Sequence, residues 1–454
     1  MRQKSKFPRF VLFLGATAGM VFVLNYFFDI EVDKNAPIIY GVSDVAYVKD
    51  GEYRLKFADD SAIRSFHIYV TDKQQTVEIK KGNGDKKKEI EVVINIPKLD
   101  VFFDKENTRL SIEVVDSSWW NFGFGNKTHK EVKIVFDDRA PKINIIKHSA
   151  SLTKGGSALI VFEVNDEYLD PSSVRIATNY GKNFTPQVFI KDNFYISLFA
   201  WPVYENEFYG YIIAKDKAQN MTKVRIPIFK RKKNYRTSKI ALSKKFLNGK
   251  ISSLFDEFKE TDADTNVQKF VYLNEGQRAK DEDNIMSLTQ AVPDDDFTNF
   301  SIEPFYPLRN GAKVASFGDF RIFTKNKKQV STSYHLGLDL ASVRRADIVS
   351  NNKAKVVFTG DNGLYGNTVI LGHSLGIYSL YSHLSRTYVN VGDSISYGKV
   401  IGKTGTTGLA LGDHVHFGTL VQGMEVRPSE WLDKRWIENN ILKVIEDAKA
   451  IVLR

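Results

Sequence analysis

The sequence contains no cysteine among its 454 residues. A disulfide framework and a thiolate metal site are therefore both excluded. Any metal must be held by nitrogen and oxygen ligands, which narrows the candidate ligands to histidine, aspartate and glutamate. Histidine is also scarce, with eight residues in the whole chain, so the positions of these eight carry most of the information about a metal site.

The composition also lacks any signature of a nucleic-acid-binding protein. The net charge is +10, and a basic run occupies residues 230–233. Such an excess can serve nucleic acid, an anionic membrane surface or an acidic polymer. Because no recognition helix, zinc-finger spacing or RNA-binding signature accompanies it, we predict a solvated basic surface and no nucleic-acid partner. The length of the chain predicts two to four domains.

The N-terminus carries the one long apolar run that we interpret as a membrane segment. Residues 1–9 include four basic side chains, and the 19 residues 10–28 are interrupted only by Asn25. A helix of that length is about enough to cross a bilayer. Three acidic residues follow between 29 and 33, so the charge bias predicts a cytoplasmic tail and an exported remainder. A cleaved signal peptide is the alternative, but it would have a shorter apolar core and a small-residue cleavage site.

An internal repeat follows the predicted anchor. The stretch NAPIIYGVSDVAYVKDGEYRLKFADD (35–60) resembles RAPKINIIKHSASLTKGGSALIVFEVND (139–166). Each copy is followed by an aspartate and then Asn-x-Thr, at Asp116 and 126–128 and again at Asp216 and 220–222. Alternating apolar and polar residues with regular turn signals predict two β-sandwich modules of immunoglobulin-like kind, 35–137 and 138–230. We interpret them as a structural stalk.

The remaining chain changes character twice. In the linker 231–303, Ile251, Leu254, Phe255 and Phe258 follow helical spacing and predict short amphipathic helices. Their apolar faces must bury against something, most simply the next domain. Residues 304–436 are rich in glycine and short strands, which predicts an antiparallel β domain, and 437–454 predicts a C-terminal helix. The predicted fold class is therefore mainly β.

Five of the eight histidines lie between 335 and 416. On a strand His414 and His416 project from the same face, so both can ligate one metal, or one can ligate while the other does acid–base work. His335 and Asp339 would lie ~13 Å apart on a flat strand, too far for bonds of ~2 Å to one zinc ion. The chain must bend between them if both bind, and Gly337 is the residue that permits a bend. Spacing alone leaves His414 and His416 equally open as the third ligand.

Two further histidines complete the cluster. His383 lies in SLYSHLS (379–385) on another predicted strand, and His373 in LGHSLG is interpreted as a hairpin-turn residue. The series His-x(3)-Asp at 335–339, Tyr-Ser-His-Leu around His383 and His-x-His at 414–416 resembles the M23 (LytM/lysostaphin-type) zinc endopeptidases of peptidoglycan. The surrounding motifs YGNTVILGH (365–373) and RPSEWL (427–432) extend the resemblance over about 130 residues.

The resemblance implies zinc bound by His335, Asp339 and His416, with His383 and His414 acting on the attacking water and the oxyanion. It also implies cleavage of peptide cross-links in peptidoglycan, between D-alanine and diaminopimelate. The predicted anchor places the chain in the inner membrane as a single-pass protein, with its catalytic domain in the periplasm. Arg321 and Tyr365 are candidates for the pocket. The alternative is a non-catalytic LytM-type scaffold that binds cell wall or activates an amidase. We further predict that the helices within 240–300 pack near the zinc cleft and restrain activity.

Overall fold

The computed structural model describes residues 33–49, 52–96, 107–260, 262–293, 297 and 300–454. The predicted cytoplasmic tail, 1–9, and membrane anchor, 10–28, lie outside these residues. Within the described ranges, no helix is both long enough and apolar enough to cross a bilayer. The chain divides into two compact units, Met1–Ala140 with Asp216–Asn220, and Pro141–Lys215 with Met221–Arg454.

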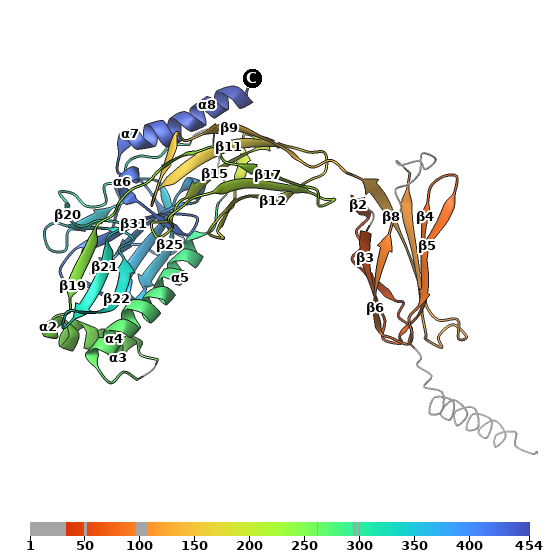
Figure 1. The fold of residues 1–454 in the computed structure, drawn as a ribbon, viewed down its shortest axis with the longest axis horizontal. Coiled ribbons are helices and arrows are strands. Elements are labelled where there is room, and N and C mark those ends of the chain that lie inside the picture. Colours follow the sequence, from red (N-terminus) through yellow and green to blue (C-terminus); the bar gives the residue numbers. More distant parts are fainter. Residues whose placement is uncertain (1–32, 50–51, 97–106, 261, 294–296, 298–299) are drawn as a thin grey trace, which may run out of the picture. The chain divides into compact units, whose positions relative to one another are not determined.

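The first unit consists of two β-sheets that enclose one apolar core (Figure 1). The larger sheet has five strands, in the order β2 (Val45–Val48), β8 (Lys127–Phe136), β7 (Arg109–Asp116), β4 (Ile63–Thr71) and β5 (Thr76–Asn83). The smaller sheet has three, β1 (Ile38–Tyr40), β3 (Glu52–Ala58) and β6 (Glu89–Asn95). Buried and more exposed residues alternate along β3 and β4, as expected for sheets with one face inward. Two sheets around one core agree with the predicted mainly β fold, whereas the immunoglobulin-like assignment stays a prediction.

The second predicted module, 138–230, begins the second unit. One sheet contains β14 (Gln187–Phe189), β15 (Lys191–Ala200), β11 (Ser157–Asn165) and β9 (Lys142–His148), in that order. The other contains β13 (Asn183–Phe184), β12 (Leu169–Thr178), β16 (Gly210–Asp216) and β17 (Met221–Arg225). A short parallel pair joins β10 (Ser151–Thr153) to β18 (Phe229–Arg231).

This module does not have a core of its own. Six successive residues of β11 are buried, and the last six of β15 are as well, which indicates strands covered on both faces. Phe162 and Trp201 belong to the same apolar cluster as Phe417 and Trp431 from the C-terminal region. The second module and the C-terminal domain therefore share one continuous core.

The C-terminal domain is built on an antiparallel sheet of eight strands. Its order is β20 (Ala312–Ala315), β23 (Leu338–Ala341), β31 (Val415–Val421), β27 (Ile377–Ser382), β26 (Asn367–Gly372), β25 (Ala354–Asp361) and β29 (Ser394–Ile395), with β32 (Met424–Val426) paired to β31. Two smaller sheets accompany it. One contains β19 (Thr237–Ala241), β21 (Phe320–Lys325) and β22 (Lys328–Tyr334), and the other β24 (Asp347–Val349), β30 (Val400–Lys403) and β28 (Arg386–Thr387). The predicted antiparallel β domain is confirmed.

The linker helices pack against this domain, as the sequence predicts. They are α2 (Lys244–Phe246), α3 (Ser252–Phe258), α4 (Asn266–Val271) and α5 (Arg278–Thr289), joined by π-helical turns at Leu247–Ile251 and Tyr272–Gln277. A capping box at Thr265 and Gln268 fixes the start of α4. The apolar residues Leu254, Phe255 and Phe270 cluster with Phe323 and Leu364 of the C-terminal domain. The linker also contributes a strand, because β19 pairs in parallel with β21.

The chain ends in the predicted helix, which follows α6 (Pro428–Trp431). It consists of α7 (Lys434–Ile437), a π-helical turn at Glu438–Leu442 and α8 (Lys443–Val452). This C-terminal segment lies along β9 of the second module (Figure 1). Nζ of Lys147 contacts Oδ2 of Asp447 at 2.8 Å, and the Ser149 hydroxyl donates to the carbonyl of Asn440 at 2.7 Å. The helix thus joins the two parts of the second unit.

Candidate metal centre

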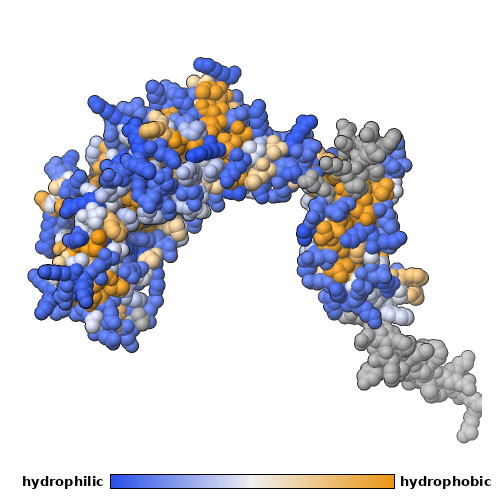
Figure 2. All heavy atoms as spheres, viewed as in Figure 1, coloured by the Kyte–Doolittle hydropathy of each residue, from blue (hydrophilic) through white to orange (hydrophobic). Residues whose placement is uncertain are grey.

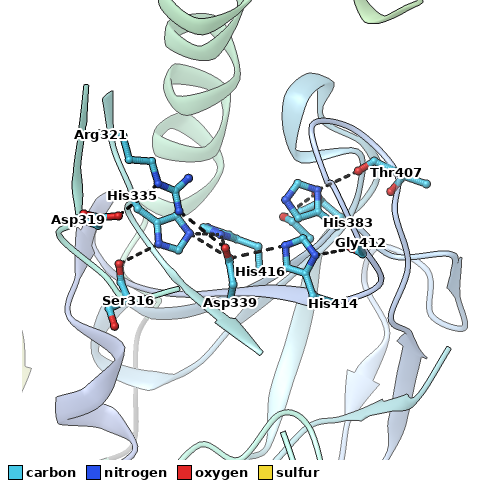
Figure 3. A network of polar contacts seen from close by, with 12 residues as sticks. Ser316, Asp319, Arg321, His335, Asp339, His383, Thr407, Gly412, His414 and His416 are labelled. Carbon is cyan, nitrogen blue, oxygen red and sulfur yellow. Dashed lines mark hydrogen bonds and ion pairs between the residues drawn. The ribbon is translucent and has the colours of Figure 1, made fainter. Parts of the chain in front are cut away.

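Three side chains from separate backbone segments converge on one point (Figure 3). His335 directly follows β22, Asp339 lies in β23, and His416 lies opposite Asp339 in the neighbouring strand β31. Nε2 of His335 lies 3.0 Å from Oδ1 of Asp339 and 3.1 Å from Nδ1 of His416. Nδ1 of His416 lies 2.9 Å from Oδ1 of Asp339, which closes the triangle.

The predicted bend between His335 and Asp339 is present, because β22 ends at Tyr334 and β23 begins at Leu338. The role of Gly337 differs from the expected one. Its φ is not among the positive values that favour glycine. A Cβ at this position would instead clash with Nε2 of His416 and lie 2.9 Å from the carbonyl oxygen of Phe417. Gly337 therefore supplies space for His416 rather than an unusual backbone conformation.

The hydrogen bonds around the triangle indicate which atoms carry protons. Nδ1 of His335 lies 2.9 Å from the carbonyl of Ser316 and must donate to it, which leaves Nε2 of a neutral ring as an acceptor. That acceptor faces the carboxylate of Asp339, so a proton or a metal cation must lie between them. Burial lowers the pKa of His416 to about 4, so this ring is neutral at pH 7.

Asp339 is buried like His416, but it keeps its charge. Burial would raise its pKa, but the interactions with the His335 and His416 rings outweigh burial when those rings present a proton to the carboxylate, and they hold the pKa of Asp339 well below its usual range. The triangle thus combines two imidazole nitrogens and one carboxylate oxygen, a set found in catalytic zinc sites with an open fourth position. The measured separations of 2.9 to 3.1 Å are close to the about 3.3 Å expected between zinc ligands in a tetrahedron. These residues fit a zinc ion.

Two more histidines flank the triangle without belonging to it. The ring centroids of His383 and His414 lie 4.9 Å apart, and that of His383 lies 6.0 Å from His416. Nδ1 of His383 donates to the carbonyl of Thr407 at 2.9 Å, and Nδ1 of His414 to that of Gly412 at 2.7 Å. In a neutral ring this leaves Nε2 as the acceptor, and Nε2 of His414 lies 3.8 Å from Oδ1 of Asp339.

His383 has two features typical of a functional residue. Burial, with smaller effects from His416 and His414, lowers its pKa to about 3, so the ring is neutral at physiological pH. Its backbone has a φ of +64°, in the left-handed region that residues other than glycine adopt uncommonly, although histidine does so more often than most. Strain of this kind persists where the surrounding structure fixes a side chain for a purpose.

The other residues considered from the sequence occupy distinct places. Nη2 of Arg321 lies 4.0 Å from Oδ2 of Asp339, and the Tyr365 ring lies 5.5 Å from that of His416. Both border the site. His373 does not: it follows β26 at the turn to β27, as predicted, and bonds to the carbonyl of Lys353 at 3.0 Å and the hydroxyl of Ser379 at 2.8 Å.

The triangle and both flanking histidines line one groove with a volume of about 1140 Å³. Its walls include residues that the sequence motifs do not indicate. Four of them are basic: Arg236, Lys239, Arg278 and Lys313. Together with Arg321, which the sequence does suggest, they give the groove five basic side chains. Phe246 and Phe270 from the linker helices line it as well. The apolar spacing of the linker predicts that its helices pack near the cleft, but it does not identify which individual side chains line the groove.

Comparison with known proteins points to the same region. Residues 333–428 match the profile of peptidase family M23. The DD-carboxypeptidase/endopeptidase Mpg of Neisseria meningitidis serogroup B is 33% identical over 94 residues, which are 21% of this chain and 22% of that protein. The peptidoglycan DD-endopeptidase ShyA of Vibrio cholerae is 31% identical over 121 residues, 27% of this chain and 28% of the relative. The chain thus matches less than a third of the length of either relative.

A crystal structure of a zinc-containing peptidase from Vibrio cholerae is also similar, with 13% identity, coverage of 72% of this chain and 82% of that one, and a TM-score of 0.27. All five residues of the histidine cluster, from His335 to His416, lie inside the range matched by the family profile. The protein carries a domain of peptidase family M23 in its C-terminal region.

Proposed function

We propose that the protein is a zinc-dependent endopeptidase that hydrolyses peptide cross-links of peptidoglycan, between D-alanine and diaminopimelate. The observation that carries the proposal is the triangle of His335, Asp339 and His416 beside two imidazoles with free Nε2 atoms. The names of the relatives, DD-endopeptidases of peptidoglycan, support the substrate class. In this proposal residues 10–28 anchor the chain in the inner membrane and the catalytic domain faces the periplasm.

The side chains divide into those that would hold zinc and those that would move protons. His335, Asp339 and His416 would hold the zinc ion. When bound, the ion would act as a Lewis acid and lower the pKa of a water molecule bound to it. The carbonyl of Ser316 orients the His335 ring, as partners of ligand histidines commonly do. Arg321 lies beside the second carboxylate oxygen of Asp339 and limits its rotation.

The hydrogen bonds of His383 and His414 support a role as general base. Their Nδ1 atoms are occupied by the carbonyls of Thr407 and Gly412, so only Nε2 can accept a proton from the attacking water. The same ring, once protonated, can donate that proton to the leaving amine. The second ring would donate a hydrogen bond to the oxyanion when it is an imidazolium, with a proton on Nε2 as well as on Nδ1.

The groove suits a substrate with free carboxylates. Five basic side chains line it, against the three acidic residues Asp319, Asp339 and Asp413. Asp339 is committed to its two histidines, and Asp319 to Arg321 and Ser238. With Arg321 set against Asp319, four basic side chains remain against Asp413. Stem peptides of peptidoglycan carry such carboxylates, whereas a neutral peptide would gain little from this lining.

The purified chain, supplied with zinc, is expected to convert cross-linked muropeptide dimers to monomers, resolved by liquid chromatography and mass spectrometry. His416→Ala should abolish conversion, and His129→Gln, which changes an exposed histidine in the first unit, should not. If the parent chain with bound zinc releases no monomer from dimers or from sacculi, the enzyme assignment is wrong and the non-catalytic scaffold takes its place.

A further inference from the structure

One loop of the first unit exposes an unusual number of aromatic side chains. The loop 117–126 joins β7 to β8, and its side chains Trp119, Trp120, Phe122 and Phe124 are 56%, 41%, 95% and 74% exposed. Figure 2 shows apolar atoms projecting from one end of this unit. A cluster of large exposed apolar side chains marks an interaction site on a soluble surface. We call residues 119–124 the aromatic loop.

The conformation of the aromatic loop is held by specific contacts. Nη1 of Arg64 donates to the carbonyls of Gly123 and Phe124, at 3.0 Å each. The backbone N–H of Gly123 donates to the carbonyl of Trp119, and that of Phe124 to the carbonyl of Asn121, each at 3.1 Å. The loop is thus a folded structure with internal hydrogen bonds.

This fold presents Phe122 to solvent at an energetic cost. Asn121 and Phe122 both have a φ of +60°, and a bulky side chain is disfavoured in that region. Phe122 contributes nothing to the core of the unit, since 95% of it is exposed. A strained backbone that projects an apolar side chain into water indicates a binding function.

The position of the loop identifies its partner. The backbone N–H of Asp33 donates to the Ser118 hydroxyl at 3.0 Å, and that hydroxyl donates to the carbonyl of Asp33 at 2.7 Å. The side chain of Asn126 also donates to the Asp33 carbonyl, at 3.0 Å. The apolar stretch 10–28 ends five residues before Asp33, and five residues span at most about 18 Å. The base of the aromatic loop is therefore tied within that distance of the predicted anchor.

Resting on the membrane anchor of the proposed function, we propose that the aromatic loop inserts into the interface of the bilayer that residues 10–28 would span. Tryptophan and other aromatic rings favour the headgroup region, because one part of the ring is apolar and another part polarisable or hydrogen-bonding. Nζ of Lys34 lies 4.7 Å from the centroid of the Trp120 ring and places a positive charge at the same level, where it can meet lipid phosphate. Insertion gives the first unit a second attachment and so fixes its orientation on the membrane.

Bromolipid quenching of tryptophan fluorescence tests this proposal with the full chain. The chain is reconstituted into vesicles of phosphatidylethanolamine and phosphatidylglycerol, with and without brominated acyl chains. Of the five tryptophans, Trp201 and Trp431 are fully buried and Trp436 is partly buried, so quenching reports on Trp119 and Trp120. We expect a blue shift and loss of emission in brominated vesicles.

Two variants make the test specific. Phe122→Ser with Phe124→Ser should remove most of the quenching while the chain still co-floats with vesicles. Phe229→Ser changes a phenylalanine that is 64% exposed in the second unit and should leave the quenching unchanged. Failure of the chain to co-float overturns the proposal together with the anchor on which it rests. Co-flotation without quenching, or a serine variant that is quenched like the parent, overturns the insertion of the loop alone. Loop-dependent binding to sacculi without bromolipid quenching would assign the loop to the cell wall instead.

Discussion

Gly337 determines whether His335, Asp339 and His416 can approach one another. A side chain at this position would meet Nε2 of His416, whose ring cannot move without leaving the triangle. We expect Gly337→Ala to destabilise the fold by about 1 to 3 kcal/mol, as overpacking does, and to weaken zinc binding. Competition with a chelator of known affinity measures the second effect. Gly249→Ala is the matched control, because a Cβ at that position would meet nothing within 4 Å. An unchanged zinc affinity in Gly337→Ala would show that Gly337 does not determine the geometry of the triangle.

His373 provides a pH-dependent prediction away from the metal. Burial lowers its pKa to about 4, below the about 6.5 of an unfolded chain. Protonation therefore favours the unfolded state, and the stability that neutral His373 contributes is lost as the pH falls from 6.5 toward 4. The difference in unfolding free energy between the parent and His373→Gln should shrink over this range by up to about 1.4 kcal/mol per pH unit. Urea titrations at several pH values measure it, and a constant difference would refute the proposed neutral state.

At the residue scale the sequence predicted much of the site. The cluster of His335, Asp339, His383, His414 and His416 was predicted, and the structure brings all five to one groove. Spacing could not choose between His414 and His416, because both project from the same strand face. The third ligand is decided by the register between β23 and β31, which places Asp339 opposite His416. This register is set by the pairing of the two strands and cannot be determined from the spacing within one strand. The metal and acid–base roles themselves stay predictions.

At the scale of elements, the linker helices both border and support the site. Phe246 lines the groove and packs against Phe270, with ring centroids 6.2 Å apart. Nζ of Lys250 donates to the carbonyl of Thr406 at 3.2 Å, next to the residue that orients His383. The helices were predictable from apolar spacing. The pairing of β19 with β21 was not, because a parallel pair between residues about 80 positions apart leaves no local pattern.

The predicted restraint by these helices can be tested with one substitution. Phe246→Ala would widen the groove without removing the helix, so restraint predicts a severalfold rise in kcat/KM on cross-linked muropeptides. Phe229→Ala, outside the groove, should have no effect. A rate that stays equal or falls in Phe246→Ala would show that the helices build the groove and do not restrain it.

At the scale of the whole molecule, the second module and the C-terminal domain behave as one body because they share a core. The sequence predicted two separate segments there, since repeats and motifs report local similarity and carry no signal for a shared interior. The unbroken burial of β11 is the physical sign that this strand is covered on both faces.

A shared core predicts coupled unfolding of the module and the zinc site. Phe162→Ala in β11 removes a fully buried ring and should lower stability by about 3 to 5 kcal/mol. The urea midpoint of zinc release, followed with a chromogenic chelator, should then shift to a lower concentration. The midpoint of unfolding followed by circular dichroism should shift with it. Phe57→Ala, equally buried but in the first unit, should leave the midpoint of zinc release unchanged. If Phe162→Ala also left it unchanged, the module would be an independent domain.

The central claim is that His416 binds zinc and His414 moves protons. The most direct test measures two quantities in variants of these residues: the zinc content, by elemental mass spectrometry, and the turnover of muropeptide dimers. His416→Ala should lose zinc and turnover together, because the triangle loses one of its three ligands. His414→Ala should keep about one zinc per chain and lose turnover by about 100-fold or more. Equal loss of zinc in both variants, or full turnover in His414→Ala, would contradict the division of roles proposed for these two histidines.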